Sequence, residues 1–145
     1  MSPAAYAAPP DGVAAIRAIE QGMAKAQTPD ALTAAWDKNV VWYDINPGEV
    51  DGLEAVRKDF AGQVSHVTNI RVTILRMQII ADSALGFAFS TQHLSAEGRN
   101  GAPDIDFVFR ETDCFQKKAG QWFLYHQQIS LPVDMQTGRA VLESK

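Results

Sequence analysis

The spacing of apolar residues predicts helices in the first half of the chain. Val13, Ile16, Ile19 and Met23 recur every three or four positions, which places them on one face of a helix. Asp11 precedes this run and suits the N-cap, because a carboxylate accepts the free backbone N–H groups of the first turn. We therefore expect a first helix from about residue 11.

Two further helices follow from the same kind of pattern. Thr28 suits a cap and Pro29 a first helical position, and the inner face of this second helix is expected to contain Leu32, Ala35 and Trp36. A third helix is expected from about Asp51. Its inner face would be formed by four apolar residues, Leu53, Val56, Phe60 and Val64.

β-Branched and aromatic residues predict the strands. Residues 40–44 read as a short strand that ends at the loop signal Asn46-Pro47-Gly48. Four longer strands are expected at 70–80, 84–94, 105–117 and 121–131. Consecutive strands joined by tight turns form an antiparallel meander.

The order of these elements predicts an α+β fold, because the helices come first and the long strands last. Three N-terminal helices would wrap one side of a strongly curved, antiparallel or mixed sheet and leave a cone-shaped cavity. We expect a flexible arm at 1–10, one domain at 11–134 and a tail at 135–145.

Composition and charge limit the classes of binding partner that we expect. The net charge of −4 and only 13 scattered Lys and Arg residues argue against nucleic acid as the main partner. The first residues lack the pattern of a signal peptide, and no apolar run approaches the ~18 residues of a membrane span. Cys114 is the single cysteine, so no internal disulfide can form. A cytoplasmic protein is expected.

Polar residues set among apolar ones suggest a pocket. His126 and Gln128 are two residues apart and share one face of the last strand, and Arg110 and Thr112 share a face of the strand before it. Asp44 ends the first strand. Each has a structural alternative: a polar ladder for the last strand, an ion pair for Arg110 and a loop cap for Asp44.

The face of the last strand that lines the cavity stays open. If the last strand has the opposite parity, Tyr125 and Gln127 face the cavity instead of His126 and Gln128. The three histidines, His66, His93 and His126, lack the spacing of a zinc site, and no phosphate-binding loop is present. No metal and no cofactor are expected.

The chain resembles SnoaL-like and ketosteroid-isomerase-like proteins of the nuclear-transport-factor-2-like superfamily over residues 11–134. One signature is Val41-Trp42-Tyr43-Asp44 followed by a loop and a helix at 53–60. The other consists of Arg110, Thr112, Asp113, Cys114, Phe115, Lys117, Gly120, Trp122, His126, Gln128, Ser130, Pro132, Val133 and Asp134. The resemblance implies the cone-shaped fold and a homodimer through the outer face of the sheet.

The resemblance also implies roles for single residues. Asp44 lies where ketosteroid isomerases have a general base. Their helix-one Tyr falls on Glu20 by ungapped counting, and their strand carboxylate would be Asp106 or Glu111. Because the Tyr is missing, steroid isomerisation is not expected.

These observations predict a hydrophobic cavity tipped by Asp44, Arg110 and His126, with Asp44 and His126 as catalytic residues. Five further residues are expected to line it: Trp42, Phe60, Thr112, Trp122 and Gln128. The ligand would be a small apolar or carboxylate-bearing molecule. Two functions remain open, namely an acid–base isomerase, cyclase or dehydratase and a non-catalytic ligand-binding or assembly module.

Overall fold

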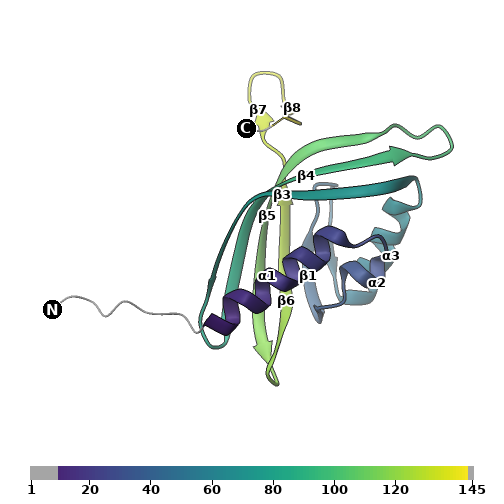
Figure 1. Ribbon diagram of the computed structural model, residues 1–145. Coiled ribbons are helices and arrows are strands. Elements are labelled where there is room, and N and C mark those ends of the chain that lie inside the picture. Colours follow the sequence, from purple (N-terminus) through teal and green to yellow (C-terminus); the bar gives the residue numbers. More distant parts are fainter. Residues whose placement is uncertain (1–9, 144–145) are drawn as a thin grey trace.

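The computed structural model describes residues 10–143, with the helices first and the long strands after them (Figure 1). The helices are α1 (Pro10–Lys25), α2 (Pro29–Leu32) and α3 (Leu53–Val64). The strands are β1 (Trp36–Tyr43), β2 (Glu49–Asp51), β3 (Val67–Ala81), β4 (Leu85–Gly98), β5 (Ile105–Lys118), β6 (Gln121–Ser130), β7 (Val133–Asp134) and β8 (Arg139–Ala140).

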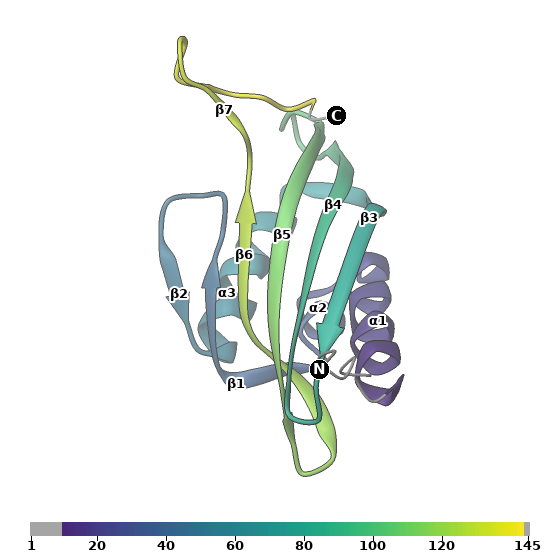
Figure 2. The ribbon, with the colours of Figure 1, turned by 90° about the vertical axis from the view of Figure 1, so that its left-hand side faces the viewer.

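The main sheet has six strands in the order β2-β1-β6-β5-β4-β3 (Figure 2). Strands β3 to β6 form the expected antiparallel meander, whereas β1 runs parallel to β6. The α+β fold with a curved, open, mixed sheet is therefore confirmed. The short strand β2 was not predicted, because its three residues lie in a segment read as a loop.

The second helix is shorter than predicted. Thr28 caps it as expected, since its Oγ1 accepts the Ala31 N–H at 3.2 Å. The helix ends at Leu32, and the carbonyl of Ala35 already accepts the N–H of Leu124 in β6 at 2.8 Å. Ala35 and Trp36 thus pair with the sheet, whereas they were expected on the inner face of a helix. The expected cap Asp11 has its side chain outside the described residues.

The helices cover one face of the sheet, here called the inner face, and leave the outer face bare (Figure 2). Helix α1 lies across β3 and β4, where Gly86 allows close approach: a Cβ at that position would come within 2.5 Å of Ile16 Cδ1. The core beneath the helices includes Ile16, Val40, Val56 and Leu124, all fully buried. Within residues 10–143, the helices lack the length and apolar character needed to cross a membrane.

A bulge in β6 decides which residues face inward. Leu124 pairs with Phe115 and His126 pairs with Cys114, so one extra residue, Tyr125, interrupts the alternation. Upstream of the bulge Leu124 faces inward, and downstream Gln127 does. The prediction that one parity holds along the whole strand is therefore wrong.

Candidate functional site

Five buried polar side chains lie together in the middle of the inner face, and we call them the polar floor. They are Ser90 and Gln92 of β4, Glu111 and Asp113 of β5, and Gln127 of β6. The strand register makes them neighbours, because Ser90 pairs with Glu111 and Asp113 pairs with Gln127. Alternation along a strand puts every second residue on the same face.

A sixth polar residue, Glu20, faces the floor from α1. Glu20, Glu111 and Asp113 each offer a carboxyl oxygen, and these oxygens lie within 4.8 Å of one another. We call the three residues the carboxyl cluster. Their exposed fractions are 1%, 8% and 1%, and no Lys or Arg in residues 10–143 forms an ion pair with them.

The hydrogen bonds around the cluster are incomplete. Gln92 Nε2 donates to Glu111 Oε1 at 2.7 Å and to Ser90 Oγ at 2.9 Å. Both carboxyl oxygens of Glu20 and Oδ1 of Asp113 have no partner with good geometry, and neither has the buried Nε1 of Trp42. A proton held between Glu20 and Asp113 would supply a missing donor, because a protonated carboxyl group can donate.

Burial raises the pKa values of all three acids, and repulsion between the acids adds to the effect at Glu111 and Asp113. Desolvation, followed by the charge of Glu20, raises the pKa of Glu111 to about 7. Desolvation and repulsion from Glu111 and Glu20 hold the pKa of Asp113 well above its usual range. Desolvation raises the pKa of Glu20, and a hydrogen bond donated by a protonated Asp113 would act against that rise.

The cluster can therefore share protons near neutral pH. Two carboxyl groups held close together cannot both ionise without a large cost, so a proton stays between them. Oxygens at this spacing would also suit a hard cation such as Mg²⁺ or Ca²⁺. A proton shared between the carboxyl groups also lowers their mutual repulsion, and it does so without a bound metal ion.

Beyond Gln92 the inner face becomes apolar toward the ends of the long strands. Phe109 pairs with Gln92 and is buried, whereas Ile74, Val72 and Leu94 are only half-buried. The inner face therefore has an apolar stretch next to the polar floor. An apolar molecule with one polar end would match this combination of surfaces.

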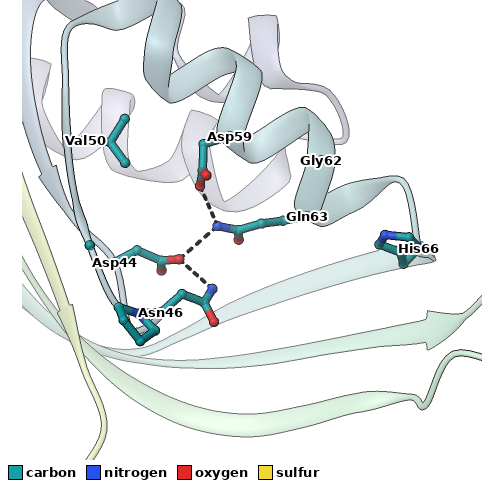
Figure 3. A pocket seen from close by; sticks show the side chains of 9 residues that line it. Asp44, Asn46, Val50, Asp59, Gly62, Gln63 and His66 are labelled. Carbon is teal, nitrogen blue, oxygen red and sulfur yellow. Dashed lines mark hydrogen bonds between the residues drawn. The ribbon is translucent and has the colours of Figure 1, made fainter.

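Asp44 lines a pocket of about 500 Å³ between the loop after β1 and helix α3 (Figure 3). Its Oδ2 accepts hydrogen bonds from Asn46 Nδ2 at 2.7 Å and from Gln63 Nε2 at 2.8 Å (Figure 3). Gln63 Nε2 also donates to Asp59 Oδ2, at 2.9 Å. Asp44 therefore lies beside a pocket that Arg110 and His126 do not line, and its Oδ1 also accepts the N–H of Ile45 in its own loop at 2.8 Å.

His126 lies on the outer side of β6, where it pairs with Val41 and Cys114. Its Nδ1 donates to the Val41 carbonyl at 2.8 Å, and its ring stands edge-on to Tyr43 at 4.8 Å between centroids. Downstream of the bulge, Gln128 shares this outer face. The sequence placed both residues on the wall of the cone, and the bulge at Tyr125 corrects that placement.

Arg110 and Thr112 also face outward, opposite to the prediction. They alternate with Glu111 and Asp113, whose side chains face inward, so Arg110 and Thr112 face outward. An ion pair between Arg110 and Asp44 is not formed in the described chain.

The three predicted aromatic residues lie on the helix-covered side. Trp42 and Trp122 are buried in the core, and Phe60 packs against it half-buried. Whether these residues contact a ligand stays a prediction. Trp42 pairs with Gln127 at the edge of the polar floor, which brings it nearest to the buried polar groups.

The sequence named Glu20 and Glu111 only as positions where a related mechanism has other groups and Asp113 only as part of a family signature, and Ser90 and Gln92 were missed. One signal was present. In Phe109-x-Glu111-x-Asp113-x-Phe115 the acids alternate in phase with aromatic residues, so they share the face that buries the rings.

Solved structures with the same fold are known. An NTF2-like protein of unknown function from Pseudomonas putida KT2440 is 18% identical, with 95% of this chain and 99% of that chain covered and a TM-score of 0.84. A ketosteroid isomerase-like protein from Erwinia carotovora atroseptica is 14% identical, with 84% and 97% covered and a TM-score of 0.72.

A proposed scytalone dehydratase from Novosphingobium aromaticivorans DSM 12444 is 15% identical, with 82% and 83% covered and a TM-score of 0.73. At these identities the likeness shows the fold alone. No curated protein sequence matches the chain. Residues 13–125 match the model of the SnoaL-like domain, and the chain belongs to that family.

Proposed function

We propose that this protein is a cofactor-independent acid–base catalyst of the isomerase, cyclase or dehydratase type. Its substrate would be a small, mainly apolar molecule bound on the inner face of the sheet. The observation that carries the proposal is the carboxyl cluster of Glu20, Glu111 and Asp113, which is buried and has no basic partner among residues 10–143.

The chemistry follows from the raised pKa values. A carboxyl group with a pKa of about 7 is half protonated at neutral pH, so Glu111 can both accept and donate a proton. In a dehydration, one carboxylate would take a proton from carbon while a neighbouring carboxylic acid protonates the hydroxyl that leaves as water. In an isomerisation, the proton taken from one carbon would be returned to another.

Two similar structures support this class of reaction by their names, a proposed scytalone dehydratase and a ketosteroid isomerase-like protein. We assign proton transfer to the cluster and not to Asp44 and His126, because His126 lies on the outer face. Asp44 keeps a proposed role in binding at the pocket beside α3, where its carboxylate is held by Gln63 and Asn46.

A non-catalytic ligand-binding or assembly module is the second candidate. The burial of the cluster favours it, because Glu20 and Asp113 are only 1% exposed. A substrate must open a path to these groups, whereas a purely structural cluster needs none.

Proton exchange at carbon separates the two candidates without knowledge of the natural substrate. A panel of small apolar ketones and hydroxyketones in deuterium oxide would be followed by proton NMR. The wild type should speed exchange for part of the panel, and Glu111→Gln and Asp113→Asn should lower that rate about 10²-fold or more.

Asp106→Asn is the matched control, because Asp106 lies on the same strand with its carboxylate exposed and bonded to His93. It should retain the wild-type rate. Equal rates for wild type and both cluster variants would refute the acid–base proposal, and the absence of any catalysed exchange across the panel would favour the second candidate.

A further inference from the structure

The pocket beside Asp44 lies on the helix-covered side of the sheet. The Asp44 side chain turns toward α3, because Gln63 of that helix donates a hydrogen bond to it. Asp59, Gly62 and Gln63 line the pocket from α3, and the loop after β1 lines it from the other side (Figure 3). A homodimer through the outer face of the sheet would therefore leave this pocket free.

Two carboxylates share one neutral donor in the pocket. Gln63 Nε2 donates to Asp44 Oδ2 at 2.8 Å and to Asp59 Oδ2 at 2.9 Å (Figure 3). Both N–H groups of this amide are thereby used. The two carboxylates are held close together, where their negative charges repel each other. A ligand that brings positive charge to this place would relieve the repulsion.

Neither acid has a Lys or Arg partner in the described part of the chain. The acids that form ion pairs within residues 10–143 are Asp30, Asp37, Glu54 and Asp106. Among the described residues, neither Lys nor Arg lines the pocket. Asp44 is half-buried, so solvent only partly screens its charge. The pocket thus keeps an uncompensated negative charge.

The spacing of the acceptors favours an organic cation over a metal ion. A hard divalent cation needs several oxygen ligands within about 2.6 Å of one point. Within residues 10–143, only the carboxyl cluster brings three such ligand atoms within 4.8 Å of one another, so Asp44, Asp59 and His66 do not form such a set. An ammonium group instead donates up to three separate hydrogen bonds. These can reach acceptors on both sides of the pocket.

We propose that this pocket binds a small primary ammonium compound, with Asp44 and Asp59 as its anionic partners. The volume of about 500 Å³ leaves room for an organic group beside the ammonium, and Pro47 and Val50 give that group an apolar wall. The backbone of Gly62 borders open space, since a Cβ there would meet nothing within 4 Å. The inference names a ligand class for the binding role proposed for Asp44, and it does not depend on proton transfer by the carboxyl cluster.

Benzylammonium is a suitable probe, because it joins a primary ammonium group to a ring that Pro47 and Val50 can contact. Benzyl alcohol carries the same ring without the charge. In a titration followed by amide NMR, benzylammonium should shift the backbone and side-chain amide signals of Gln63, and benzyl alcohol should bind at least tenfold more weakly. Asp44→Asn and Asp59→Asn should each weaken benzylammonium binding about tenfold, the effect of losing one charge-assisted hydrogen bond.

Asp51→Asn is the matched control, because Asp51 is an exposed acid on β2 that lies outside the pocket lining. It should bind benzylammonium like the wild type. If Asp44→Asn unfolds at a lower temperature, Asp59→Asn carries the test, because the Asp59 side chain is exposed and its replacement should leave stability nearly unchanged.

Three results would overturn the site: equal binding of benzyl alcohol, an equal loss of binding in Asp51→Asn, or unchanged binding in Asp59→Asn. Tighter binding of magnesium ion than of benzylammonium would overturn the assignment to an organic cation. The titration does not measure proton exchange at carbon, so this proposal and the acid–base proposal can fail separately.

Discussion

At the scale of single residues, Glu111 makes stability depend on pH. Its pKa is about 7 in the folded chain against an ordinary 4.5, so between these values the folded chain keeps a proton that the unfolded chain releases. The free energy of unfolding should therefore decrease as pH rises from 4.5 to 7. The total loss attributable to Glu111 would be on the order of 3 kcal/mol. Urea unfolding across this range measures it.

Glu111→Gln should flatten that dependence and be more stable than the wild type above pH 7, because the amide cannot ionise and still accepts from Gln92. Asp51→Asn, an exposed acid on β2, should leave the slope unchanged. Parallel curves for wild type and Glu111→Gln would show that Glu111 does not hold a proton in this range.

Only part of the candidate site could be predicted from the sequence. Asp44 was expected at a cavity shared with Arg110 and His126, and Glu20 and Glu111 were named only as positions where a related mechanism has other groups. The partnership of Glu20 with Asp113 depends on how α1 lies over β5, and no local pattern contains that information. The inward direction of Glu111 conflicts with the general preference of acids for solvent, so it was not expected.

At the scale of elements, the close approach of α1 to the sheet depends on Gly86. A methyl group there would come within 2.5 Å of Ile16 Cδ1 and 3.1 Å of Ala81 Cβ, and both of those side chains are buried. Gly86→Ala should lower the free energy of unfolding by about 1–3 kcal/mol through overpacking. Chemical denaturation of the variant measures the change.

Gly22→Ala in helix α1 is the control, because a Cβ at Gly22 meets nothing within 4 Å. Alanine favours helix over glycine, so this variant should gain up to about 1 kcal/mol. A Gly86→Ala protein as stable as the wild type would mean that α1 can shift away from β4 at little cost.

The order of elements was predictable, because long alternating runs specify strands and the three- and four-residue spacing specifies helices. The bulge at Tyr125 was not. It lies where β6 pairs with both β5 and the parallel strand β1. These pairings join residues far apart in the sequence, so no local pattern predicts them. The same pairing ends α2 early, through the bond between Ala35 and Leu124.

At the scale of the whole molecule, the bare outer face predicts self-association. Ile80, Leu85 and Phe87 are 56%, 57% and 40% exposed, and together with Cys114 they line an apolar pocket near one end of the strands. Exposed apolar patches of this kind mark interaction sites. We predict a homodimer through this face, as the resemblance to SnoaL-like proteins implies.

Analytical ultracentrifugation of Phe87→Arg tests that prediction. A buried charge at the interface would be expensive, so the variant should sediment as a monomer at concentrations where the wild type is a dimer. Arg71→Gln, away from the apolar pocket, should remain dimeric. A wild type that is monomeric at high concentration would contradict the homodimer.

Protons held by the carboxyl cluster are central to the proposed chemistry, and carboxyl-carbon NMR of the side chains measures them directly. Titration of the labelled protein from pH 4 to 9, with Glu111→Gln and Asp113→Asn to assign the signals, gives the ionisation of each group. We predict that Glu111 titrates near pH 7 and that Asp113 stays protonated above its usual range. If Glu20, Glu111 and Asp113 all ionise between pH 4 and 5, like exposed acids, the proposed acid–base site is wrong.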